Sequence, residues 1–322
     1  KFNMSVYLKA IKYSFTIWYL WHESCLSIGM ILKEDAAKGL FLGLAIGDAM
    51  GSPIEFEKKR TQKNYVRSYL EGGFHKVTKG EFTDDTSMAL AMADAMIESQ
   101  QKNGYAFDPY KIMDNFLKWR YEGKYSPRGE CFDVGVTVCG ALAQYKKDRS
   151  GPFTGSRDPM SAGNGGLMRL APALIVSRTK EECLMFARET TRLTHGAEEA
   201  LMYSEIFAEE IWEGRVLPQY VRYKHPLNID RNHIMSGGYV KETYQAAWWA
   251  YQTTNNFEDC LLKAINRGHD SDTTGAVAGM IAGCFYGYGN IPKWMVDGLQ
   301  WNKKIKEMAQ SIHEVAGLSP KT

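Results

Sequence analysis

Apolar side chains recur at helical spacing along most of the chain from Lys33 onward, and alternating stretches of β-branched residues are few. Apolar residues repeated at intervals of three and four are typical of helices that bury one face. The pattern predicts helices over residues 109–121, 132–147, 181–190, 197–214, 240–253 and 257–267. We therefore expect an all-α protein.

Two apolar segments carry glycine at every fourth position. The first holds Gly39, Gly43, Gly47 and Gly51, and the second holds Gly275, Gly279, Gly283 and Gly287. Glycine inside a helix costs about 1 kcal/mol relative to alanine. Glycines on one face of successive turns therefore indicate that another backbone approaches that face closely. The two ladders predict tightly packed central helices.

Three long stretches lack a helical pattern: residues 53–81, 148–166 and 217–238. Loops of this length in a compact domain are commonly functional. No break in composition marks a domain boundary among them. We expect one domain over residues 33–322, preceded by an N-terminal extension over residues 1–32.

The composition limits the possible functions. The 322 residues are 44% hydrophobic and 24% charged, which is typical of a globular protein with a sizeable core. The formal net charge of +2 creates no overall field that would attract nucleic acid or an anionic membrane. Residues 13–32 are the most apolar stretch, but His22 and Glu23 interrupt it before it reaches the length of a membrane span. We expect a cytoplasmic protein that binds neither nucleic acid nor membrane.

Two motifs, far apart in the sequence, gather carboxylates and hydroxyls at predicted helix starts. They are Thr83-Asp84-Asp85-Thr86 and Asp270-Ser271-Asp272-Thr273-Thr274, the second of which precedes a glycine ladder. Thr and Asp commonly cap helices, so capping alone is one explanation. Two adjacent acids exceed what capping needs, however, and four carboxylates in one pocket would repel each other unless cations neutralised them. Because the ligands would be oxygens without cysteine, the motifs favour Mg²⁺, Mn²⁺ or Ca²⁺.

Five further residues have ambiguous roles. Asp48 and Glu55 flank Gly51-Ser52-Pro53 at the end of the first ladder, where either could be a surface charge, and Asp133 could start a helix. Asn164 lies among glycines, where it could adopt a positive φ in a turn or help a loop present backbone N–H groups to phosphate. His195 could be structural or could line a site.

Taken in order along the chain, these pieces resemble the ADP-ribosylglycohydrolase family between about residues 36 and 294. The motifs that carry the resemblance are GLAIGDAMG at 43–51 with Glu55-Phe56, GEFTDDT at 80–86, GNGGLMR at 163–169 with Pro172, GYV at 238–240, AAW at 246–248 and DSDT at 270–273. Each motif is common alone, but the ordered set is specific.

The resemblance implies an orthogonal all-α bundle with a centre of two Mg²⁺ or Mn²⁺ ions. It assigns Thr83, Asp84, Asp85 and Asp272 to one ion, and Asp85, Asp270, Asp272 and Thr273 to the other. It also places Glu55 beside the ions as a mobile acid, Asn164, Gly165 and His195 along an ADP-ribose cleft, and Asp133 facing the leaving side chain.

The implied activity is hydrolytic removal of ADP-ribose from a modified protein side chain, in the first instance the N-glycosidic bond to arginine. Both the departing guanidine and the oxocarbenium character of the ribose need stabilisation. We hypothesise that water activated by the ions attacks the anomeric carbon, with Glu55 or Asp84 as general base and Asp133 as the partner of the guanidinium. His269 departs from the family, in which glycine is common at that position, but every predicted ligand is present.

Other functions stay open. Residues 1–32 lie outside the resemblance and are rich in aromatic side chains, including Trp18 and Trp21, which suits a partner surface as well as packing on the chain's own domain. The protein could therefore protect against an ADP-ribosyltransferase toxin, either by reversing its modification or, as an inhibitory protein, by occluding the toxin with this arm. A metal-dependent phosphoesterase would use similar ions but fits the ordered motifs less well.

Overall fold

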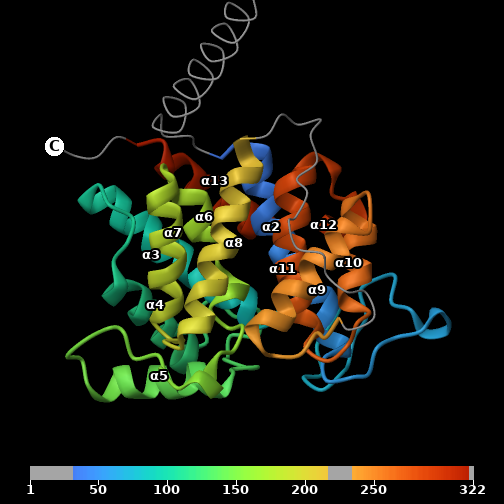
Figure 1. The fold of residues 1–322 in the computed structure, drawn as a ribbon, viewed down its shortest axis with the longest axis horizontal. Helices are drawn as coiled ribbons and strands as arrows, with labels where there is room; N and C mark the ends of the chain where they lie inside the picture. The colour runs from blue at the N-terminus through green and yellow to red at the C-terminus, as the bar shows by residue number, and fades with distance from the viewer. Residues whose placement is uncertain (1–31, 217–233, 319–322) are drawn as a thin grey trace, which may run out of the picture.

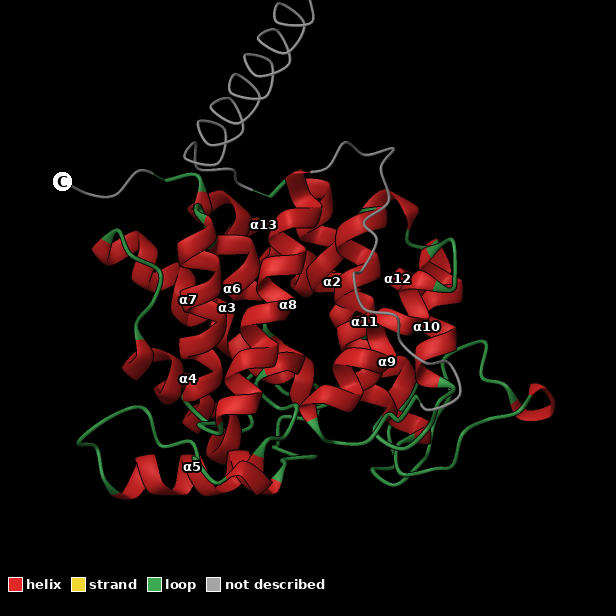
Figure 2. Ribbon diagram, in the orientation of Figure 1, coloured by secondary structure: helices red, strands yellow, loops and turns green. Residues whose placement is uncertain are grey.

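The computed structural model describes residues 32–216 and 234–318. Over these ranges the chain forms α-helices and short 3₁₀ turns joined by loops, and it forms no strand (Figure 2). The α-helices are α2 (Glu34–Gly51), α3 (Asp84–Asn103), α4 (Pro109–Glu122), α5 (Val136–Lys147), α6 (Ala171–Val176), α7 (Lys180–Arg192), α8 (Glu198–Val216), α9 (Val240–Gln252), α10 (Phe257–Ile265), α11 (Ser271–Tyr286), α12 (Lys293–Gly298) and α13 (Asn302–Ala316). The 3₁₀ turns are η1 (Ser52–Ile54), η2 (Gln62–Asn64), η3 (Pro159–Ser161), η4 (Leu167–Arg169) and η5 (Tyr288–Asn290). The predicted all-α class is confirmed.

Five of the six helices predicted from periodicity match an observed helix to within two residues at each end. The sixth, predicted over 132–147, is wrong at its start, because α5 begins only at Val136. Asp133 has a φ of 56°, in the left-handed region, and cannot be part of a right-handed helix. Asp133 therefore lies in the loop before α5.

The two glycine ladders face each other in the antiparallel pair α2 and α11, which forms the centre of the bundle (Figure 1). A Cβ atom on Gly43 would overlap the carbonyl oxygen of Gly279, and one on Gly283 would overlap that of Gly39. The predicted close approach of two backbones is confirmed. The pairing also brings the end of α2 beside the start of α11, because Gly51 lies against the backbone of Asp272.

Other helices cover this central pair. α3, α6 and α13 pack together along one side of it, whereas α9 and α10 pack on α11 (Figure 1). A single hydrophobic cluster runs through the described residues from Leu32 to Ala316. Leu32 is 2% exposed, and its carbonyl oxygen lies 2.7 Å from His313 Nε2, so this residue packs against α13. The rest of the predicted extension lies outside the described residues.

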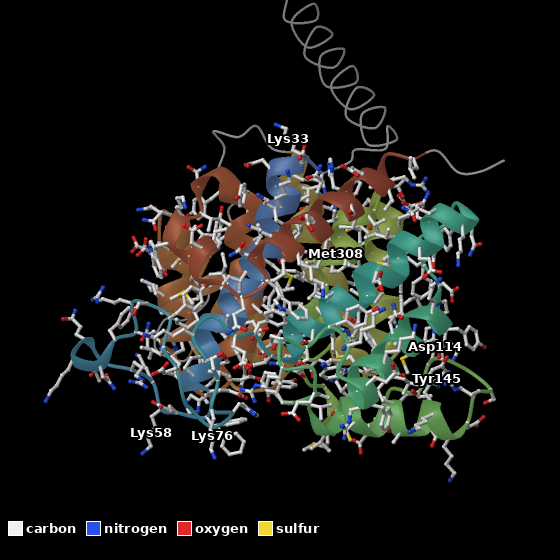
Figure 3. The ribbon with its side chains drawn as sticks, turned by 180° about the vertical axis from the view of Figure 1, so that it is seen from behind. Lys33, Lys58, Lys76, Asp114, Tyr145 and Met308 are labelled. Carbon is white, nitrogen blue, oxygen red and sulfur yellow. The ribbon has the colours of Figure 1, made fainter. Side chains whose placement is uncertain are left out.

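The predicted loops at 53–81 and 148–166 contain no helix beyond the turns η1, η2 and η3. Most of the predicted loop at 217–238 lies outside the described residues. Lys58 and Lys76 mark the first loop on one side of the molecule, and Asp114 and Tyr145 mark the contact between α4 and α5 on the other (Figure 3). In the described ranges, no helix combines the length and the apolar character needed to cross a membrane.

Candidate active site

The starts of α3 and α11 bring the two predicted carboxylate motifs together at the end of α2. Thr83 and Asp270 are the N-cap residues of α3 and α11, but neither side chain makes a capping hydrogen bond. Capping therefore does not explain these residue types. Their polar atoms make other contacts, which begin with Asp48.

Asp48 is fully buried and links α2 to the start of α3. Its carboxylate accepts hydrogen bonds from the backbone N–H groups of Thr83 and Thr86, at 2.9 and 3.0 Å, and from both hydroxyls, at 2.9 and 2.6 Å. Burial raises the pKa of Asp48 to about 6, although these hydrogen bonds oppose the rise. The possibility that Asp48 or Glu55 is a surface charge is wrong, since their exposed fractions are 0% and 7%.

Two groups of carboxylates form around Asp272. Oxygen atoms of Asp48, Asp85 and Asp272 lie within 4.8 Å of one another, and so do oxygen atoms of Glu55, Asp270 and Asp272. Asp272 belongs to both groups. This is the arrangement expected where one carboxylate lies between two cations.

Two of the buried carboxylates, those of Asp85 and Asp272, each have an oxygen with no hydrogen bond to stabilise its charge. Oδ1 of Asp85 and Oδ1 of Asp272 are buried without a hydrogen-bond partner. Burial, reinforced by the neighbouring acids, raises the pKa of Asp84, Asp85 and Asp272 well above the ordinary aspartate range. Oxygen donors with unused lone pairs and no sulfur or nitrogen among them suit hard divalent cations such as Mg²⁺ or Mn²⁺.

The predicted cation ligands are placed differently with respect to these groups. Asp85, Asp270 and Asp272 lie within them, whereas the carboxylate of Asp84 lies outside both and faces the adjoining cavity. Thr273 also lines the cavity, and the hydroxyl of Thr83 donates to Asp48. Asp48 and Glu55, which the resemblance did not assign as ligands, each complete one group.

A cavity of about 560 Å³ opens beside the carboxylates. Nine of the predicted site residues line it: Glu55, Asp84, Asp133, Asn164, Gly165, His195, Asp270, Asp272 and Thr273. Thr83 and Asp85 lie behind its wall and are fully buried. The fold therefore brings residues from six separate sequence regions to one cavity.

Asn164 is oriented by contacts on two sides. Its Nδ2 donates to Asp270 Oδ2 and to Thr243 Oγ1, both at 2.8 Å, and its backbone N–H donates to the carbonyl of Gly238 at 3.0 Å. The alternative that Asn164 adopts a positive φ is wrong, because only six non-glycine residues in the described ranges do so and Asn164 is not among them.

His195 is neutral and held from one side. Its Nδ1 lies 2.9 Å from Thr194 Oγ1, which also accepts a hydrogen bond from Arg169 Nη2 at 2.7 Å. Burial lowers the pKa of His195 to about 3. A Cβ atom on Gly165 would lie 2.7 Å from the imidazole, so glycine is required where this ring meets the loop.

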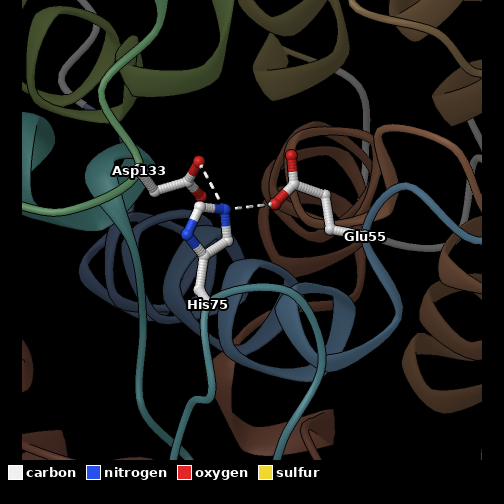
Figure 4. A group of neighbouring side chains, drawn as sticks. All are labelled: Glu55, His75 and Asp133. Carbon is white, nitrogen blue, oxygen red and sulfur yellow. Dashed lines mark ion pairs between the residues drawn. The ribbon is translucent and has the colours of Figure 1, made fainter.

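His75 belongs to the site but was not among the predicted residues. Its Nε2 lies 3.0 Å from Glu55 Oε2 and 2.9 Å from Asp133 Oδ1, and the ring points between the two carboxylates (Figure 4). Partial burial opposes a charge on the ring, but the two carboxylates raise the pKa of His75 to about 9. A single histidine in a long polar loop gives no local signal of such a position.

Three non-glycine residues beside the cavity have left-handed backbones. Phe56, Asp133 and His269 have φ values of 63°, 56° and 56°. The backbone of His269 exchanges hydrogen bonds with the segment after Glu55, in both directions at 2.7 Å. A φ of this sign favours glycine, which gives a physical reason for the glycine that the resemblance leads one to expect at position 269.

Comparisons with known proteins agree with this geometry. The family model described as ADP-ribosylglycohydrolase matches residues 31–321. The chain is 35% identical to the ADP-ribosylarginine hydrolase Tri1 of Pseudomonas putida, over 88% of this chain and 79% of that protein. It is 28% identical to the ADP-ribosyl-[dinitrogen reductase] glycohydrolase of Rhodospirillum rubrum, over 88% and 98% of the two chains.

A solved structure supports the same assignment. The fold is similar, with a TM-score of 0.74 and 33% sequence identity, to a structure titled "ADP-ribosylglycohydrolase-related protein complex", over 88% of this chain and 98% of that one. Both the extent of the family match and the identity to these relatives exceed what a shared fold alone would give. The chain belongs to the ADP-ribosylglycohydrolase family of hydrolases.

Proposed function

We propose that the protein hydrolyses the N-glycosidic bond between ADP-ribose and an arginine side chain of a modified protein, and that it uses two Mg²⁺ or Mn²⁺ ions to do so. The observation that carries the proposal is the pair of carboxylate groups that share Asp272 and open on one cavity. Asp85, Asp270 and Asp272, with Thr83, Asp84 and Thr273, would hold the ions, and Asp48 would orient Thr83 through its hydrogen bonds. When bound, the ions would supply charge neutralisation and Lewis-acid activation of water and of the ribose hydroxyls.

The residues of the cavity have complementary roles in this reaction. Water adds to the anomeric carbon as the C–N bond breaks, and Glu55 or Asp84, which both line the cavity, accepts the proton that the water loses. The guanidine that departs takes up one proton, so the reaction is balanced. His195 contacts the bound ADP-ribose as a neutral ring, and Asn164 keeps Asp270 in place.

The preference for arginine is supported by the name of one relative and by the charge of the cavity. That relative is named as an ADP-ribosylarginine hydrolase. In this chain, the carboxylates of Glu55 and Asp133 both line the cavity, where they would attract a cationic leaving side chain. A leaving group without positive charge would gain less from this arrangement.

The test is release of ADP-ribose from an arginine-modified protein and from a serine-modified protein, each with Mg²⁺, with Mn²⁺ and with chelator. We expect cation-dependent release from the arginine-modified protein. Asp272→Asn should lower the rate by at least about a hundredfold, whereas Asp297→Asn, an exposed acid on α12, is the matched control and should leave it unchanged. Equal release in chelator, or release only from serine, would contradict the proposal.

Protection against an ADP-ribosyltransferase toxin is a separate proposal. Such protection would need residues 1–32 only if the protein occludes the toxin, and not if the protein hydrolyses the ADP-ribosylated product of the toxin. Removing residues 1–31 and measuring affinity for the transferase distinguishes the two routes, since a hydrolase that merely reverses the modification needs no affinity for the enzyme that made it.

A further inference from the structure

The contact between His75 and the two carboxylates is close but poorly matched. Nε2 of His75 lies within 3.0 Å of an oxygen of Glu55 and of Asp133, yet it forms an aligned hydrogen bond with neither. Oε2 of Glu55 and Oδ2 of Asp133 are both buried without a hydrogen-bond partner. The Glu55 side chain is only 7% exposed and lines the cavity.

A different cation would satisfy these acceptors better. The imidazole reaches the carboxylates with one N–H, which must be shared between acceptors on opposite sides (Figure 4). A guanidinium is also planar and cationic, but it carries five N–H donors in a fork that can meet two carboxylates in good alignment. The slot between Glu55 and Asp133 therefore fits a guanidinium more closely than it fits the ring that occupies it.

The surroundings of the slot also suit a planar cation. The rings of Phe74, Phe132 and Phe56 lie with their centroids 4.9, 6.0 and 6.1 Å from that of His75. Aromatic faces attract cations. The ring of Phe132 already carries the guanidinium of Arg128, 3.8 Å from its centroid, and Phe56 and Phe74 are largely exposed, so these rings add a modest attraction to that of the carboxylates.

The backbone that carries His75 is held independently of the ring. A tight turn is closed by paired hydrogen bonds between Gly72 and Val77, at 2.7 and 2.8 Å. Arg128 Nη2 donates to the carbonyl of His75 at 2.9 Å, and its Nε donates to Glu81 at 2.7 Å. The imidazole can leave the slot by side-chain rotation while the turn keeps these bonds.

We propose that His75 is a specificity-determining residue, which fills the slot between Glu55 and Asp133 until the guanidinium of the leaving arginine displaces it. The identity of the ligand rests on the proposed function, but guanidinium binding can be measured without hydrolysis. His75 separates two carboxylates that would otherwise repel each other. A side chain must outcompete it to enter, and a guanidinium does so through its additional hydrogen bonds.

The experiment is calorimetric titration of the Mg²⁺-loaded protein with agmatine, which presents a guanidinium, and with cadaverine, which presents ammonium groups. The proteins are wild type, His75→Ala, His75→Gln and Asp133→Asn. If His75 occupies the slot about nine-tenths of the time, removing it should strengthen agmatine binding about tenfold. Asp133→Asn should weaken agmatine binding, and cadaverine should stay the weaker ligand in every variant.

An affinity for agmatine that is unchanged or lower in both His75 variants would overturn the proposal, and so would an equal gain in affinity for cadaverine, which loss of the positive charge of His75 would produce without displacement. The wild-type protein gives a second test that needs no variant. Saturation with agmatine should shift the ring-proton NMR signals of His75, and unshifted signals would equally refute displacement. Failure of the proposed function would give a different result, namely no release of ADP-ribose, and a protein that releases none can still bind agmatine in the slot.

Discussion

Replacing Asp85 with asparagine asks whether the buried carboxylates form a cation site or a structural network. Asp85 is fully buried, and its Oδ1 has no hydrogen-bond partner. Asparagine has nearly the same shape, removes one negative charge and adds N–H donors that the neighbouring carboxylates can accept. We therefore expect Asp85→Asn to stabilise the cation-free protein while it abolishes both the response to cations and hydrolysis.

The spacing of the carboxylates sets the magnitude of the stabilisation expected for Asp85→Asn in the cation-free protein. Oxygens of Asp48, Asp85 and Asp272 lie within 4.8 Å of one another. Two unit charges at that distance repel by about 3.5 kcal/mol at an effective dielectric constant of about 20. Proton uptake by the cluster relieves part of this repulsion, so we expect a gain of about 1–3 kcal/mol. At roughly 2 °C per kcal/mol, the thermal midpoint should rise by about 2–6 °C.

The assay is thermal unfolding at pH 7.5 with chelator and with Mn²⁺. At a Mn²⁺ concentration 100 times the dissociation constant, binding should stabilise the wild-type protein by about 2.7 kcal/mol, and the variant should gain almost nothing. Asp48→Asn is the matched contrast: it removes an acceptor of the hydrogen bonds from Thr83 and Thr86 and should destabilise the protein with or without cation. If Asp85→Asn lowers the midpoint in chelator as Asp48→Asn does, the reasoning is refuted.

Three further changes test other parts of the account. Burial raises the pKa of Glu55 to about 7 and that of Asp48 to about 6. Between about pH 4 and 7 the folded state therefore holds protons that the unfolded chain has lost, so the thermal midpoint in chelator should fall as the pH rises. A thermal midpoint that rises over this range would contradict the expectation. Gly279→Val forces α2 and α11 apart and should cost about 3 kcal/mol or more in urea unfolding; an unchanged midpoint would refute the close packing. Arg128→Met breaks the bonds to Glu81 and should cost about 2 kcal/mol in the same assay, and a neutral effect would show that this pair is not stabilising.

The centre of the fold could be predicted because its partners carry matching local signatures. Gly43 and Gly279 each sit in a ladder with a four-residue period, and only close contact between two backbones makes such a pattern worth its cost in helix propensity. The acids of the early motif at residues 83–86 and of the late motif at residues 270–274 could be placed at helix starts, because each motif directly precedes an apolar helical pattern. Once α2 and α11 are paired, their ends bring Asp272 beside Asp48.

The remaining parts of the site depend on contacts that leave no periodic trace. His75 reaches Glu55 because its turn packs on the backbone of Pro53 and is held by Arg128, and neither contact is visible in a loop sequence. The start of α5 was misplaced because apolar spacing does not report the left-handed backbone of Asp133. Loop residues whose positions are set by distant partners are therefore the ones that sequence reasoning missed.

The most direct test of the central claim, a two-cation centre built on Asp272, is the anomalous-difference map of crystals grown with Mn²⁺. The account predicts two peaks that share Asp272, one beside Asp85 and one beside Asp270. A map without peaks at these carboxylates at saturating Mn²⁺, or with ions bound only elsewhere, would contradict it.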